Sequence, residues 1–169
     1  MSKKKELRSI CRIGVSSGGE WGAVATAAGF VGEYLHTVDN KGRVALPAKF
    51  REMLGPRFMI ARGLDKCLTV YPSEEWALVL NNIKALPQNQ KEARAYARYF
   101  LSGATEVDPD RQGRVLVPQG LREYAGLTKD VYVLGVGNRV EIWDKAAWDG
   151  AKLDIGERFS TIAERVPGI

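Results

Sequence analysis

The sequence predicts a mixed α/β fold built on a core of β-strands, in which one structural unit occurs twice. A segment from Asp39 to Pro47 returns 71 positions later as Asp110 to Pro118, and similar strand and helix patterns follow each copy. Duplicated units usually pack against each other, because neither buries its apolar face alone. The chain has 169 residues, 45% of them hydrophobic, whereas one copy of roughly 60 residues would be marginally stable by itself. We therefore expect one continuous core shared by both copies.

The repeated segment begins with a turn between two strands. Each copy has an aspartate at its first position and a glycine at its fourth: Asp39 and Gly42, then Asp110 and Gly113. Aspartate favours a type I turn, and the glycine supplies the positive φ that closes a hairpin with a bulge. In the first copy we expect the incoming strand at residues 33–39 and the outgoing strand at residues 43–46. Pro109, just before the second turn, lacks an N–H donor, which predicts altered pairing there.

A short helix is expected after each turn. Pro47 and Pro118 suit the first turn of a helix, and Gly55 and Gly126 suit its C-terminal end. Apolar side chains recur at i, i+3 and i+4 in both helices: Phe50, Met53 and Leu54, then Leu121, Tyr124 and Ala125. One side of each helix is therefore expected to be buried.

Two further strands and longer helices follow in each copy. The strands are expected at residues 58–62, 67–71, 131–134 and 139–143, with turns at 63–66 and 135–138. Ser73 and Asp144 are expected to be helix N-caps. The helices are expected at residues 74–85, about 90–101, and 145–165 with a weak point at Gly150 or Gly156.

These patterns divide the chain into three parts. We expect an N-terminal extension at residues 1–29, a first repeat with its helices at 30–101, and a second repeat with a C-terminal helix at 102–169. The extension mixes a lysine run with Ser/Gly-rich and Ala/Gly-rich stretches, and this predicts disorder or an overlong assigned start.

The sequence also favours a soluble cytoplasmic protein. Residues 16–20 interrupt any signal peptide, and no stretch reaches the roughly 20 apolar residues of a membrane span. Two cysteines, Cys11 and Cys67, provide neither a disulfide framework nor the spacing of a metal site. We expect no metal, no cofactor and no small-molecule substrate.

The positive charge is concentrated near the first turn. The formal net charge is +5, with five basic and two acidic residues in 1–29, 11 and seven in 30–100, and nine and 11 in 101–169. The basic residues of the first repeat include a cluster around the turn: Lys41, Arg43, Lys49 and Arg51. This distribution, more than the net charge, indicates a nucleic-acid surface.

The turns therefore become candidate DNA contacts. The candidate residues are Asp39, Lys41 and Arg43 in the first copy, and Asp110, Arg111 and Arg114 in the second. A two-stranded ribbon fits the major groove, where an arginine can donate two hydrogen bonds to guanine. The aspartate can hold the arginine fork by a charged pair. Turn formation with a merely solvated arginine explains one copy equally well, but two copies with the same arginine favour binding.

Other chemistry has weaker support. His36, the one histidine, has no partner at a useful spacing, and Cys67 lies in an apolar stretch as a small hydrophobic residue would. A catalytic pair of these two lacks an orienting third group, so we expect no enzyme. Trp76 and Trp148 occupy matched helix positions and are interpreted as core or interface anchors.

Several further motifs resemble one protein family. They are Gly32-Glu33-Tyr34, Pro47 to Arg51, Arg62 to Leu68, Ser102 to Glu106 and Asn138 to Asp144, beside the Asp-x-x-x-Arg pattern at Asp39–Arg43 and Asp110–Arg114. Over residues 30 to 150 the chain resembles the MraZ family, whose two halves are similar to AbrB.

The resemblance implies a fold and a function. The fold is a swapped-hairpin (double-split) β-barrel formed by tandem AbrB-like repeats, with packed helices. The function is a sequence-specific transcriptional regulator, a repressor acting on the promoter of the division and cell-wall gene cluster. A ring-shaped homo-oligomer that associates with the nucleoid and binds direct repeats in double-stranded DNA is also implied. The alternative is a protein-binding module that resembles AbrB-like antitoxins.

Overall fold

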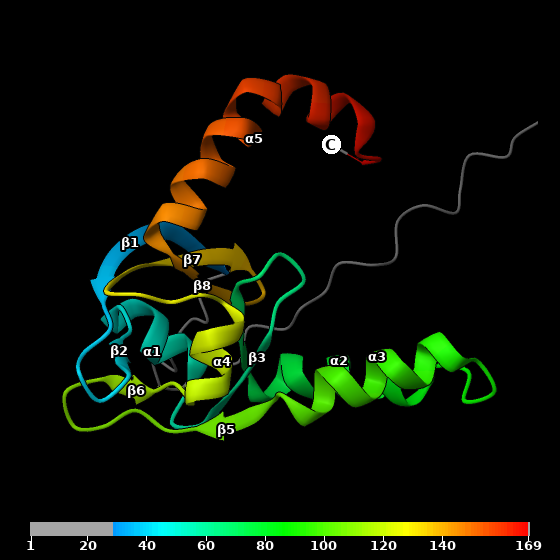
Figure 1. Cartoon of the computed structure of the whole chain (residues 1–169), viewed down its shortest axis with the longest axis horizontal. Coiled ribbons are helices and arrows are strands. Elements are labelled where there is room, and N and C mark those ends of the chain that lie inside the picture. The colour runs from blue at the N-terminus through cyan, green and yellow to red at the C-terminus, as the bar shows by residue number, and fades with distance from the viewer. Residues whose placement is uncertain (1–28, 169) are drawn as a thin grey trace, which may run out of the picture.

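The computed structural model describes residues 29–168, so the expectations for residues 1–28 lie outside it (Figure 1). Its strands are β1 (Phe30–Thr37), β2 (Arg43–Ala45), β3 (Phe58–Arg62), β4 (Leu68–Pro72), β5 (Thr105–Val107), β6 (Arg114–Leu116), β7 (Asp130–Gly137) and β8 (Val140–Asp144). Its helices are α1 (Ala48–Leu54), α2 (Ser73–Lys84), α3 (Lys91–Ser102), α4 (Gln119–Tyr124) and α5 (Lys145–Arg165). The mixed α/β class is confirmed.

The two repeats exchange strands. One antiparallel sheet has the order β1-β7-β8-β4-β3-β5, and a second contains only β2 and β6. Strand β1 of the first repeat pairs with β7 of the second along its length, from Phe30 opposite Gly137 to Thr37 opposite Asp130. Strand β3 likewise pairs with β5. The larger sheet is open at β1 and β5, so its hydrogen bonds do not close a barrel.

The main core lies between these sheets and draws on both repeats. Its buried residues are Phe30, Val44, Leu46, Phe50, Leu54, Phe58, Ile60, Leu68 and Val70 from the first repeat, and Val115, Val117, Leu121, Ala125, Val131, Val133, Val140 and Ile142 from the second. The expectation of one continuous core is confirmed.

The repeated short helices also form as predicted. Helix α1 begins after Pro47 and ends at Gly55, which has φ +80°, and α4 begins after Pro118 and ends before Gly126, which has φ +59°. These glycines adopt a conformation that a side chain would strain. The apolar stripes face the core as expected.

Two local expectations are corrected here. The turns do not join two-stranded hairpins. Strand β1 pairs with β7, and only the isolated Val38–Val44 bridge beyond its end connects it to β2. Strands β5 and β6 pair with β3 and β2. The predicted turn at 135–138 is too long, since residues 135–137 continue β7. A Cβ at Gly135 would lie 2.4 Å from the Val31 nitrogen, so this glycine permits the close approach of β1.

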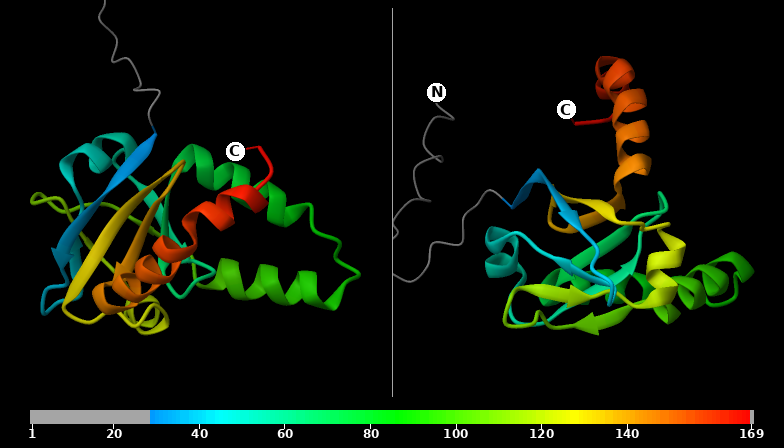
Figure 2. Two further views of the ribbon diagram at one scale, coloured as in Figure 1. Left: turned by 90° about the horizontal axis from the view of Figure 1, so that it is seen from above. Right: turned by 60° about the vertical axis from the view of Figure 1, so that its left-hand side comes forward.

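The helices outside the main core form their own contacts. Ser73 begins α2 without capping it, because its hydroxyl donates to the Arg57 carbonyl, whereas Asp144 accepts from the Ala146 N–H as the predicted N-cap of α5. Helix α5 runs unbroken through Gly150 and Gly156. Figure 2 shows α2 and α3 side by side, extending away from the sheets, and α5 projecting from the sheets at a separate place. Within the described residues no helix combines the length and apolarity of a membrane span.

Candidate nucleic-acid interface

The two predicted turns have the same backbone geometry. In the first, the Gly42 N–H donates to the Asp39 carbonyl at 2.9 Å, and the Asp39 N–H donates to the Arg43 carbonyl at 2.9 Å. The corresponding distances in the second turn are 2.9 Å and 2.8 Å. Pro109 therefore does not alter the turn itself. In the strand before the turn, Pro109 occupies the position that matches Val38, and the Val38–Val44 bridge has no counterpart among the described residues.

Each aspartate carboxylate organises its own turn. One oxygen of Asp39 accepts the backbone N–H groups of Lys41 and Arg43, both at 2.9 Å, and the other accepts Arg43 Nε–H at 2.7 Å. Asp110 accepts from Gln112 and Arg114 at 2.9 to 3.0 Å in the same way, and in this copy Arg114 Nη2 also lies 2.8 Å from Asp110 Oδ2. The predicted charged pair thus forms in both copies, and the same carboxylate also holds the turn.

The pairing of β2 with β6 brings the two Asp–Arg pairs together. Arg43 lies opposite Leu116, and Ala45 lies opposite Arg114. Arg43 Nη1 is then 3.7 Å from Asp110 Oδ2, and Arg114 Nη1 is 3.7 Å from Asp39 Oδ2. The four residues form one reciprocal cluster, which we call the Asp–Arg quartet. Its side chains are 26 to 33% exposed, so both guanidinium groups remain accessible to solvent.

The quartet shifts the acidity of its carboxyl groups. Hydrogen bonds from the turn N–H groups, first among them that of Arg43, together with the guanidinium lower the pKa of Asp39 to about 2. The Arg114 backbone and side chain lower the pKa of Asp110 to about 2 in the same way. Both carboxylates are therefore ionised at neutral pH and keep the arginines oriented.

Two further arginines clamp the turns from the opposite repeat. Arg51 donates Nε–H to the Leu46 carbonyl, and its guanidinium lies against Gly113, where a Cβ would be 2.5 Å from Cζ. Arg122 donates to the Val117 carbonyl and lies against Gly42. This role was not predicted from the sequence. The repeat carried the signal, since Arg51 and Arg122 occupy matched positions.

Backbone bonds complete this clamp. The Leu46 N–H donates to the Gly113 carbonyl at 3.2 Å, and the Val117 N–H donates to the Gly42 carbonyl at 3.0 Å. Each turn is thus held by the backbone N–H of the residue that directly follows the outgoing strand of the other repeat. The arrangement fixes the relative position of the turns and favours a rigid binding surface.

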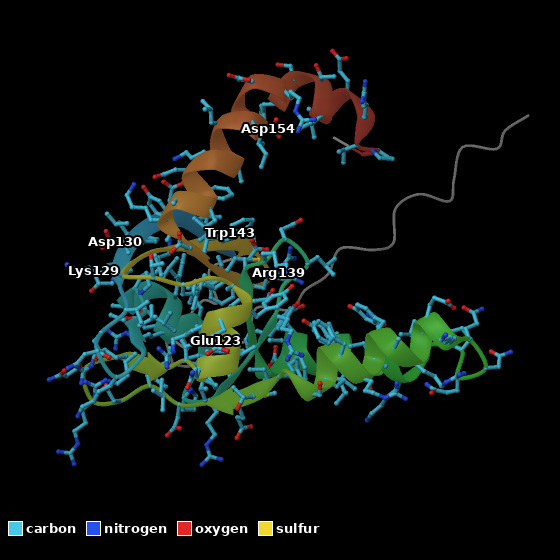
Figure 3. The ribbon with its side chains drawn as sticks, viewed as in Figure 1. Glu123, Lys129, Asp130, Arg139, Trp143 and Asp154 are labelled. Atoms are coloured by element: carbon cyan, nitrogen blue, oxygen red, sulfur yellow. The ribbon has the colours of Figure 1, made fainter. Side chains whose placement is uncertain are left out.

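The remaining predicted contacts lie at the turn tips. Lys41 and Arg111 are exposed, but they are not equivalent, because Lys41 matches Gln112 and Arg111 matches Asn40. Figure 3 shows nitrogen-tipped side chains projecting from the end of the molecule that holds the β1–β2 and β5–β6 loops. The two tips therefore offer positive charge from different positions.

The residues considered for catalysis are not brought together. His36 lies on β1 and Cys67 precedes β4, with β7 and β8 between these strands. Burial raises the pKa of the Cys67 thiol to about 12, which opposes formation of a thiolate nucleophile. Cys67 packs with Leu134 and Trp143, as expected for a small buried hydrophobic residue.

Comparison with known proteins identifies relatives of both repeats. The family described as "MraZ protein, putative antitoxin-like" matches residues 30–99 and again residues 100–166. The chain is 51% identical over 137 residues to the transcriptional regulator MraZ of Acetivibrio thermocellus, covering 81% of this chain and 96% of that protein. It is 52% identical over 135 residues to the protein of that name in Desulfitobacterium hafniense, covering 80% and 94%. These relatives are named as regulators and not as enzymes, in agreement with the expectation from sequence.

Proposed function

This chain belongs to the MraZ family, and from that premise we propose that it is a transcriptional regulator that binds double-stranded DNA sequence-specifically. It acts as a repressor at the promoter of the division and cell-wall gene cluster. It works in the cytoplasm, associated with the nucleoid. Its relatives carry the name of transcriptional regulators, which supports the regulatory role.

The observation that carries this proposal is the Asp–Arg quartet. Each aspartate holds the Nε of its arginine at 2.7 to 2.9 Å, whereas the contact from Arg43 Nη1 to Asp110 is longer than a hydrogen bond at 3.7 Å. The terminal nitrogens of Arg43 thus stay available for guanine O6 and N7. Because the fork is already oriented, less rotamer freedom is lost on binding.

The tips supply a second kind of contact. Lys41 and Arg111 are exposed beside the quartet and contact phosphates, which strengthens binding without selecting sequence. Asp39 and Asp110 position the arginines and do not contact bases themselves. We further propose that the two sheets, which share one apolar core, correspond to the swapped-hairpin barrel of the family although the larger sheet is open at β1 and β5, with repeats at 30–101 and 102–169.

Several subunits act together in this proposal. The β2–β6 ribbon of a single chain covers only a few base pairs, too few for a specific operator. A ring-shaped homo-oligomer presents several ribbons on one face and binds DNA elements arranged as direct repeats.

The test compares binding to promoter DNA and to scrambled DNA by gel shift. Replacing both arginines, Arg43→Ala with Arg114→Ala, is expected to remove operator preference, since each bidentate contact is worth about 1 to 3 kcal/mol. The matched control is Arg57→Ala with Arg98→Ala, which removes the same charge from sites away from the ribbon. Unchanged operator preference in the quartet variant would contradict the proposal, and a promoter reporter then tests repression.

The family description favours one alternative, an antitoxin-like module that binds a protein. A pull-down from cell extract separates the two functions. Promoter fragments recovered with the chain support the DNA-binding regulator, whereas one stoichiometric protein without DNA supports the alternative.

A further inference from the structure

Strand β6 carries an exposed leucine within the candidate DNA surface. Leu116 is 57% exposed, whereas Val115 and Val117 on either side of it are fully buried. Side chains alternate between the faces of a strand, so Leu116 points away from the core. Single exposed leucines are common on protein surfaces, and the position of this one is what distinguishes it.

Leu116 is the direct neighbour of a quartet arginine. It lies opposite Arg43 in the β2–β6 pairing, and the Cβ atoms of directly opposite residues are about 4.5 to 5.5 Å apart. The outward positions of the ribbon are thus occupied by two arginines, Leu116 and Ala45. The surface around Arg43 therefore combines a guanidinium fork with one branched apolar side chain.

We propose that Leu116 contacts the 5-methyl group of a thymine next to the guanine bound by Arg43. This inference rests on the proposed DNA-binding function and extends it to a second base. The thymine methyl is the apolar group that the major groove presents. Its contact with Leu116 removes apolar surface of both partners from water, and a cytosine at that position lacks the methyl.

The contact lets the ribbon distinguish the two orientations of a DNA element. Ala45 occupies the position in the first repeat that Leu116 occupies in the second, and it faces Arg114. An alanine side chain is too short to make the same contact. The two arginines therefore sit in different surroundings, and the ribbon distinguishes an element from its reverse. This agrees with recognition of direct repeats.

The test removes single methyl groups from the DNA. Each thymine in the promoter footprint is replaced in turn by deoxyuridine, and Kd is measured by fluorescence anisotropy. For the native chain, one replacement per element is expected to weaken binding about fourfold, the effect of one buried methyl group. For Leu116→Ala the same replacement should have no effect. Leu35→Ala is the matched control, because Leu35 is 55% exposed on a strand outside the ribbon.

The outcomes distinguish a failure of the proposed thymine contact from a failure of the proposed DNA-binding function. If deoxyuridine has no effect, or an equal effect on the native chain and on Leu116→Ala, the thymine contact is wrong even when the arginine variant loses operator preference. If the arginine variant keeps operator preference, the DNA-binding proposal itself fails. Light scattering is run on Leu116→Ala as well, and a lower mass than that of the native chain would overturn the inference by placing Leu116 between subunits.

Discussion

The guanidinium of Arg122 lies so close to Gly42 that a Cβ on this glycine would be 2.6 Å from Cζ. Gly42 has φ +80°, so alanine would strain the backbone and also displace the arginine. The same relationship joins Arg51 to Gly113. Each turn of the candidate DNA surface is thus shaped around an arginine of the other repeat.

We predict that Gly42→Ala destabilises the fold more than the same substitution does at an ordinary glycine with positive φ. Gly126→Ala is the control, because Gly126 has φ +59° and a Cβ placed on it would meet no atom within 4 Å. Left-handed strain alone costs about 1 kcal/mol, and losing the Arg122 hydrogen bond costs about 1 kcal/mol more. Urea unfolding measures both variants. Equal losses would show that the arginine moves freely, and in an Arg122→Ala background the difference should disappear.

The Asp–Arg quartet predicts a loss of stability in acid. Asp39 and Asp110 have pKa values of about 2 in the folded chain, below the ordinary value of 3.8. A pKa lowered by folding stabilises the folded state above the unfolded value, and this contribution is lost as the pH falls from about 4 toward 2. Urea midpoints measured across this range should therefore fall more steeply for the native chain than for Asp39→Asn with Asp110→Asn. Parallel curves would contradict the lowered pKa values of the two aspartates.

Substitutions at the turns should separate the contribution of positive charge to DNA affinity from that of the planar guanidinium group. Arg43→Lys keeps the charge and loses the planar fork, so it should recover only part of the operator affinity lost in Arg43→Ala. Lys41→Ala should weaken binding to all sequences and reduce the slope of log K against log salt by about one unit. Salt titrations on promoter and scrambled DNA test both effects. Full recovery by lysine would rule out bidentate recognition.

Local structure was predictable from the sequence, whereas strand pairing was not. The turn at Asp39, the α1 stripe and the Asp144 cap depend on neighbours within a few residues, and the structure confirms them. The partner of β2 depends on residues about 70 positions away. Because the pattern of β2 fits a hairpin with β1 as well as a pairing with β6, only the fold distinguishes them.

At the candidate site, too, the geometry within one turn was predictable from the sequence, whereas the contacts between the repeats were not. The repeat placed Asp39 and Arg43 in one turn, but their approach to Asp110 depends on the β2–β6 register. The clamp by Arg122 was missed for the same reason, since its target belongs to the other repeat. Gly135 looked like a turn residue because glycine is typical of turns, whereas here it makes room for β1.

Cys67 should resist alkylation in the folded chain. Burial raises its pKa to about 12, so almost no thiolate exists at pH 8. In a Cys11→Ser background, iodoacetamide should label Cys67 only after denaturant is added. An added Leu64→Cys, at a position 84% exposed, should be labelled without denaturant. Mass spectrometry counts the labels, and rapid labelling of Cys67 in the native state would contradict its burial.

The proposed ring predicts where subunits meet. Of the two tryptophans interpreted above as core or interface anchors, Trp76 stacks on the buried Phe100 of its own chain. Helix α5 has no buried residue, and its Leu153 and Phe159 are each 67% exposed. Large apolar side chains this exposed favour contact with another subunit.

We therefore predict that Leu153→Asp with Phe159→Asp lowers the mass of the assembly measured by light scattering. The variant should keep the unfolding midpoint of the sheets, because α5 contributes no buried residue. It should also lose operator affinity with the Asp–Arg quartet intact, since linked ribbons raise the effective concentration at neighbouring DNA elements. Glu157→Ala with Arg158→Ala, which changes exposed charges on the same helix, is the control. A native chain that is monomeric and protects a palindrome at full affinity would refute the ring, because tips on one face of a ring meet DNA as direct repeats.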